Sequence, residues 1–139
     1  MKNTFATVQY AADDLFIAIP PSGHAITLDI DSDRSAGPGP LELLLVALGG
    51  CTGADVISIL RKKRMQVTDY RIEVQGERRE EYPKSFRKME VKHILKGRGI
   101  AEDAVKQAID LSVTKYCGVA ASLRPTVEIS STYEIHNEQ

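Results

Sequence analysis

The chain contains two cysteines, Cys51 and Cys117, and each lies where a reactive thiol could act. Cys51 interrupts an unusually apolar stretch rich in glycine, and Cys117 ends a second amphipathic stretch. A thiolate can attack a peroxide oxygen and become a sulfenic acid, with which a second thiol condenses to a disulfide. The pair therefore predicts thiol redox chemistry, provided that the fold brings the two sulfur atoms together.

The spacing of the cysteines leaves a second interpretation open. They are 66 positions apart (117 minus 51), so they form no local C-x-x-C redox motif. Two buried, inert cysteines that pack as small apolar residues could have the same spacing in the sequence. Asp55 follows Cys51 by four residues and shares its helix face. A carboxylate there repels a thiolate unless a cation pairs with the carboxylate. Alternatively, Asp55 simply makes a buried hydrogen bond.

Size and charge limit the class of protein. A chain of 139 residues, 42% hydrophobic and 27% charged, suits one domain with a real core, so we expect a single domain over 1–139. The formal net charge of −1 gives no overall attraction to nucleic acid or to an anionic membrane. The basic run 61–64 is interpreted as solvated surface, and no nucleic-acid partner is expected.

The N-terminal residues lack the continuous apolar segment of an export signal. The longest apolar run, Leu43–Leu48, is far too short to cross a bilayer. We therefore expect a cytoplasmic protein without a membrane partner, in which free or redox-active thiols are the rule.

Hydrophobic periodicity predicts the elements that must position the two thiols. Alternating residues indicate three strands before residue 31, with a turn at 20–23. A helix from about Pro40 to Arg64, two strands near 70–75 and 88–95, a helix from about Ala101 to Tyr116 and a strand over 127–135 follow. This order predicts an α+β fold with a mainly antiparallel sheet and two main helices.

The first predicted helix is apolar nearly all round in its N-terminal half. Such a helix needs cover on every side, which predicts either a central helix wrapped by sheet or a dimer interface. Three glycines surround Cys51, although glycine costs about 1 kcal/mol relative to alanine inside a helix. They indicate close packing against another backbone, room for a substrate, or both.

Residues 37–52, GPGPLELLLVALGGCT, resemble the signature of the OsmC/Ohr family of osmotically inducible and organic-hydroperoxide-resistance proteins. The segment Lys115–Cys117 is similar to the family's second cysteine segment. The resemblance implies an intertwined homodimer with two active sites at the subunit interface. It also implies a cysteine-based peroxidase that acts on organic hydroperoxides. By position, Cys51 matches the peroxidatic cysteine and Cys117 the resolving one, and the resulting disulfide requires an external thiol, such as a dithiol or lipoyl-type protein.

The resemblance further implies an arginine and a glutamate that hold and activate the thiolate. The family's glutamate directly follows the proline at the helix start, but Leu41 stands there and Glu42 comes one place later. At about 100° per residue, Glu42 and Cys51 point to opposite helix faces. Arg34, in the preceding loop, is the first candidate for the arginine, and Arg124 is the second.

The predicted catalytic site thus comprises two thiols and three charged side chains: Cys51, Cys117, Arg34, Glu42 and Asp55. The three histidines show no ligand spacing with either cysteine, so neither a metal site nor a cofactor is expected. A cysteine–histidine hydrolase with His93 or His24 as base has no local support. The alternative is a divergent family member that binds an apolar small molecule or senses redox state without efficient turnover; a purely structural dimer is a third reading.

Overall fold

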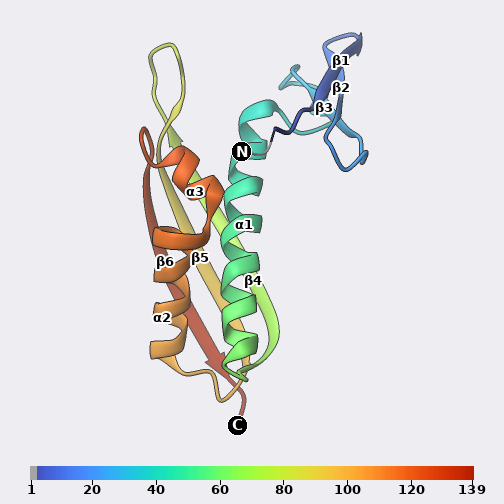
Figure 1. Ribbon diagram of the computed structural model, residues 1–139. Helices are drawn as coiled ribbons and strands as arrows, with labels where there is room; N and C mark the ends of the chain where they lie inside the picture. Colours follow the sequence, from blue (N-terminus) through green and yellow to red (C-terminus); the bar gives the residue numbers. More distant parts are fainter. Residues whose placement is uncertain (1–2) are drawn as a thin grey trace. The chain divides into compact units, whose positions relative to one another are not determined.

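The computed structural model describes residues 3–139 as two compact units, which divide the chain between Leu44 and Leu45. The first unit contains a three-stranded antiparallel sheet in the order β1-β2-β3 (Figure 1). Its strands are β1 (Thr7–Ala12), β2 (Leu15–Ile19) and β3 (Ile26–Asp29). The predicted N-terminal meander is therefore confirmed, and the expectation of a single domain over 1–139 stays a prediction.

The second unit is built on a sheet of the order β4-β5-β6. Its strands are β4 (Gln66–Arg78), β5 (Phe86–Arg98) and β6 (Glu128–Asn137). The first two form an antiparallel hairpin, whereas β6 lies parallel to β5. Parallel neighbours need a crossover connection, which the helical segment between residues 98 and 128 provides. The α+β fold with a mainly antiparallel arrangement is thus confirmed.

Helix α1 (Pro40–Lys62) matches the first predicted helix to within two residues. The second predicted helix is only partly correct. The α-helix α2 (Glu102–Leu111) ends early, and a π-helical turn η1 (Ser112–Tyr116) and a short helix α3 (Gly118–Leu123) follow. The π-helical turn carries apolar and polar residues without any periodic signal of its own, so hydrophobic patterning could not separate it from α2.

The core of the second unit lies between the sheet and two helices that cover one of its faces (Figure 1). It joins Val56 and Leu60 of α1 to Leu95 of β5 and to Val105 and Ala108 of α2, all of them fully buried. Because these residues recur at helical spacing, the apolar stripes of α1 and α2 both face the sheet.

Two of the glycines around Cys51 bring α1 close to β4. A methyl group added at Gly53 would collide with the Ile72 side chain, and one added at Gly49 would lie 3.1 Å from a Val74 methyl. Gly50, in contrast, has open space where a side chain would stand. Close packing therefore accounts for Gly49 and Gly53, which lie one helical turn apart.

Helix α1 is long and apolar enough, by length and composition, to cross a membrane, with a mean hydropathy of 2.0 in its most apolar window. A core helix of a soluble protein passes the same test. Helix α1 contacts β4 and contributes residues to the core, so it packs on one face of the sheet. Only 33% of that window is buried, so this packing accounts for part of its apolar character.

Candidate functional site

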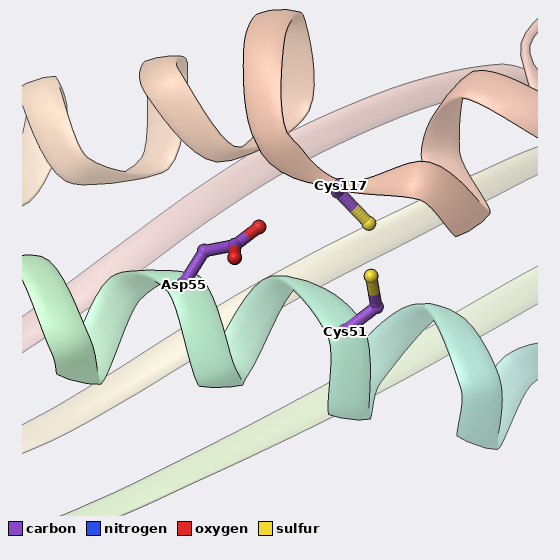
Figure 2. Close-up of side chains that lie close together, drawn as sticks. All are labelled: Cys51, Asp55 and Cys117. Carbon is purple, nitrogen blue, oxygen red and sulfur yellow. The ribbon is translucent and has the colours of Figure 1, made fainter.

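The structure brings the two cysteines of the chain together in the second unit. The sulfur atoms of Cys51 and Cys117 and a carboxylate oxygen of Asp55 all lie within 4.8 Å of one another. Figure 2 shows the two sulfurs pointing toward each other, Cys51 from α1 and Cys117 from the segment just before α3. Both thiols are free. Three of the five predicted groups, Cys51, Cys117 and Asp55, therefore form one cluster.

The π-helical turn η1 is the local structure that delivers Cys117. The Cys117 backbone N–H donates to the Ser112 carbonyl at 2.7 Å, which closes the wide turn. The chain then becomes extended at Cys117 and starts α3. There the Cys117 sulfur accepts the Ala120 N–H at 3.3 Å, so the thiol caps one of the unpaired amides at the start of that helix.

The two thiols differ in their exposure. Cys117 is buried, with 2% of its surface accessible, and Cys51 is half-buried. Burial, and next the adjacent Cys51 thiol, raise the pKa of Cys117 to about 11 against the opposing hydrogen bond from Ala120. Cys117 is therefore a protonated thiol at neutral pH. Cys51 is the more exposed residue of the two.

A buried pair of hydroxyl groups holds the Asp55 carboxylate. Ser112 Oγ lies 2.8 Å from Asp55 Oδ2 and 3.0 Å from Thr52 Oγ1. A hydroxyl carries one proton, so if Ser112 donates to the carboxylate it accepts from Thr52. Within residues 3–139, no lysine, arginine or histidine forms an ion pair with Asp55.

Sequence reasoning missed both hydroxyl residues. A signal for Ser112 exists, because it lies seven positions after Val105 and three after Ile109, on the apolar stripe of the second helix. A hydroxyl on a buried stripe needs a partner, and here the partners are Asp55 and Thr52.

Arg34 has a different partner, in the first unit. Its Nε and Nη2 atoms donate to the two oxygens of Asp29 at 2.8 and 2.9 Å. The Asp29 carboxylate is completely buried and also accepts the backbone N–H groups of Asp31 and Ala36. The Arg34 guanidinium, helped by these amides, holds the pKa of Asp29 well below its usual range. The charge of Arg34 is thus already paired, and its predicted role beside Cys51 stays a prediction.

The remaining charged candidates are exposed. Glu42 lies in the first turn of α1, where an acid suits the positive end of the helix dipole. Arg124 follows α3 and Lys115 lies over the Tyr116 ring, 5.3 Å from its centre. None of these three side chains makes a hydrogen bond or ion pair with the thiol cluster within the described part of the chain. Roles for Glu42 and Arg124 also stay predictions.

One of the two histidines of the second unit, His93, is a core residue. His93 is completely buried on β5, and its Nδ1 atom is hydrogen-bonded to the Tyr70 hydroxyl. Burial lowers the pKa of His93 to about 4, so the ring is neutral near pH 7. In the described residues His93 makes no hydrogen bond to a cysteine. The structure therefore shows no cysteine–histidine contact of the kind that a hydrolase with His93 as base would need.

The cluster of Cys51, Cys117 and Asp55 can therefore do two kinds of chemistry. Two free sulfurs at this separation can join in a disulfide once they move closer together. Among residues 3–139, the same three residues also form a group whose sulfur and oxygen atoms could jointly hold a metal ion.

Comparisons with known proteins show relatives of the same architecture. A family model described as "OsmC-like protein" matches residues 31–132. Protein YhfA of Escherichia coli K12 is 41% identical over 130 residues, which cover 94% of this chain and 96% of YhfA.

Two solved structures share the fold. The crystal structure of an OsmC-like protein from Mycoplasma pneumoniae is 22% identical, covering 98% of this chain and 99% of its own, with a TM-score of 0.84. An organic hydroperoxide resistance protein from Elizabethkingia anophelis is 11% identical, covering 99% and 98%, with a TM-score of 0.69.

Proposed function

Because this chain belongs to the OsmC-like family, we propose that it is a thiol peroxidase that reduces organic hydroperoxides through Cys51 and Cys117. The observation that carries the proposal is the approach of two free sulfurs, from positions 66 apart, to within 4.8 Å. Organic hydroperoxide resistance proteins share the fold, and this supports the choice of substrate class.

In the first step the Cys51 thiolate attacks the outer oxygen of a hydroperoxide ROOH. An S–O bond forms, the O–O bond breaks, and the alkoxide RO⁻ leaves and takes a proton to become the alcohol. Cys51 is oxidised to a sulfenic acid. Its assignment as the attacking group is supported by its greater exposure, because Cys117 is buried and protonated.

In the second step the Cys117 sulfur attacks the sulfur of the Cys51 sulfenic acid. An S–S bond forms and the hydroxyl leaves as water with the Cys117 proton. A disulfide needs the two sulfurs at about 2.05 Å, so α1 and the segment before α3 must move together to bring the sulfurs closer from at most 4.8 Å. An external dithiol, of the lipoyl or protein type, then reduces the disulfide and restores both thiols.

The proposal includes a homodimer in the cytoplasm. On the second unit, an apolar depression of about 480 Å³ lies between α1 and β4. It is lined by Leu45, Val46, Gly49, Gly50, Ile72 and Val74. Val46 is 67% exposed although it lies on the apolar face of α1. A second copy of the chain would cover this surface, and could also supply the cation that a thiolate beside Asp55 requires. Arg34 and Glu42 remain the family-based candidates for activating that thiolate.

Turnover of cumene hydroperoxide with a dithiol reductant, in the presence of a chelator, tests the proposal. We expect Cys51→Ser to abolish turnover, by about 10³-fold or more, because the attacking atom is lost. Cys117→Ser should turn over more slowly than the unaltered chain, since its Cys51 sulfenic acid has no internal partner and must react directly with the external dithiol. Circular dichroism of both variants controls for folding.

Mass spectrometry after one equivalent of hydroperoxide separates this function from its alternative. Rapid formation of a Cys51–Cys117 disulfide supports the peroxidase. Two intact thiols would favour a protein that binds an apolar molecule, and a slowly formed disulfide without turnover would favour a redox sensor. Unchanged turnover in Cys51→Ser would remove this residue from the mechanism.

A further inference from the structure

We propose that Cys51, Asp55 and Cys117 form a binding site for one divalent metal ion of the zinc class. Two sulfurs and a carboxylate oxygen lie within 4.8 Å of one another. Ligands of a tetrahedral zinc ion, at about 2.3 Å for sulfur and 2.0–2.2 Å for oxygen, are separated by roughly 3.5–3.8 Å. The three ligand atoms therefore need to approach one another by at most about 1 Å. Figure 2 shows them pointing into one shared space.

The charge at this position favours a cation. Asp55 accepts a hydrogen bond from Ser112 and has no ion-pair partner within residues 3–139. Both cysteines become anionic ligands when they lose their protons. Three negative groups around one point repel one another, and a divalent ion removes that repulsion.

The groups behind two of the three donors, Asp55 and Cys117, hold them as ligands are held in metal sites. Ser112 fixes one oxygen of Asp55 and is itself bonded to Thr52, and both hydroxyl residues are almost completely buried. The Ala120 N–H donates to the sulfur of Cys117. Hydrogen bonds of this kind orient the ligands of a metal, and their loss typically costs 10- to 100-fold in affinity.

Binding balances in protons and charge. Each thiol releases one proton to water, and the resulting complex of M²⁺ with two thiolates and one carboxylate has a net charge of −1. Because each thiol must lose its proton before it can bind the metal, affinity falls as the pH decreases. Three protein ligands leave a fourth tetrahedral position for water, as in open zinc sites.

This site goes beyond the proposed peroxidase but shares its sulfurs. A sulfur bound to zinc is shielded from a hydroperoxide, so metal and oxidant compete for the same reduced form of the protein. The sequence-based expectation of no metal site considered histidine ligands. The structure offers a site without histidine, assembled from α1 and the segment before α3.

Metal titration of the reduced, chelator-treated full chain under anaerobic conditions tests the proposal. We expect one Zn²⁺ per chain with release of about two protons at neutral pH. Co²⁺ should give thiolate-to-metal charge-transfer absorption in the near ultraviolet and the intense visible bands of a tetrahedral complex. Added Zn²⁺ should also slow disulfide formation by cumene hydroperoxide.

Variants identify the ligands. Cys51→Ser and Cys117→Ser should each remove the two-thiolate Co²⁺ spectrum and weaken Zn²⁺ binding by about 100-fold or more. Asp55→Asn and Ser112→Ala should weaken it by about 10- to 100-fold. Asp110→Asn, which changes an exposed acid on α2, is the matched control and should bind like the unaltered chain.

The proposal fails if Co²⁺ shows no thiolate charge transfer, or if either cysteine variant binds as tightly as the unaltered chain. It also fails in its present form if Asp55→Asn behaves like Asp110→Asn. Circular dichroism checks that each variant folds. Asp55→Asn retains both thiols, so it tests the site independently of the cysteine variants. Zinc binding without hydroperoxide turnover would overturn only the peroxidase, whereas turnover in chelator without zinc binding would overturn only the metal site.

Discussion

The chain contains two acids whose partners differ sharply, one in each structural unit. Asp29, at the end of β3, is buried and accepts two hydrogen bonds from the Arg34 guanidinium and two from backbone amides. Asp55, on α1, is half-buried and accepts a hydrogen bond from one hydroxyl group, Ser112. Its other close neighbours are two sulfurs.

The difference separates a structural acid from a reactive one. The charge of Asp29 is neutralised within its own unit, so this group stabilises a loop and has no capacity left for another ion. The charge of Asp55 is not neutralised by any described side chain, and it lies beside groups that can become negative. An acid in such surroundings either repels a thiolate or attracts a cation from outside the unit.

Acid should affect the two units in separate pH ranges, and this is the largest effect on stability that we predict. Burial holds His93 neutral, with a pKa lowered from 6.5 to about 4. Below pH 6.5 the unfolded chain binds a proton that the folded chain resists, so stability falls until about pH 4. The loss is roughly 3 kcal/mol. The lowered pKa of Asp29 affects stability at lower pH. The stability that ionised Asp29 contributes is lost only as the pH falls below 3.8, the ordinary pKa of this group.

Urea unfolding at several pH values measures this loss. His93→Gln should be less sensitive than the unaltered chain between pH 6.5 and 4, and His136→Gln, at an exposed position, should behave like the unaltered chain. Equal pH dependence in all three proteins would show that His93 is not kept neutral by the fold.

The same substitution at the two acids should have different effects on the thiols. In the chelated, reduced protein, Asp55→Asn removes a negative charge from beside Cys51. Alkylation of Cys51 by iodoacetamide near pH 7 should become faster, because a negative charge no longer lies beside the attacking sulfur. Asp29→Asn should leave this rate unchanged. A slower reaction of Asp55→Asn would mean that a cation, from Arg34 or from a second copy, pairs with Asp55 in the assembled protein.

Replacing Arg34 by lysine should have the smallest effect. Lysine keeps the positive charge but cannot make the two-pronged contact with the Asp29 carboxylate. We expect the Tm to fall by only a few degrees and the reactivity of Cys51 to remain the same. Thermal unfolding and alkylation rates measure the two properties separately. A clear loss of hydroperoxide turnover with an unchanged Tm would instead assign Arg34 to the catalytic site, as the family resemblance suggests.

Hydrophobic patterns predicted the helices and strands well where a segment showed a single clear pattern. Alternation located the N-terminal meander, and the apolar run after Pro40 located α1. They failed at Ser112–Tyr116, because a π-helical turn depends on which hydrogen bonds the tertiary structure permits. The parallel pairing of β6 with β5 was equally invisible, since it depends on the route of the crossover.

The candidate site was predictable in part. Residue type singled out Cys51 and Cys117, and helical spacing placed Asp55 on the face of Cys51. The roles of Ser112 and Thr52 could not be read in this way, because their bonds join positions 60 apart. The predicted arginine, Arg34, is paired with an acid that sequence reasoning did not consider.

By itself, the sequence determined the family, the order of most helices and strands, and the presence of two thiols in suitable local settings. Only the tertiary structure decided that these thiols meet, that Cys117 is buried and caps a helix, and that Asp55 joins them without a cation from its own unit. The physical reason is that periodicity reports on local burial. Contact between residues 66 positions apart depends on how α1, η1 and the sheet pack against one another.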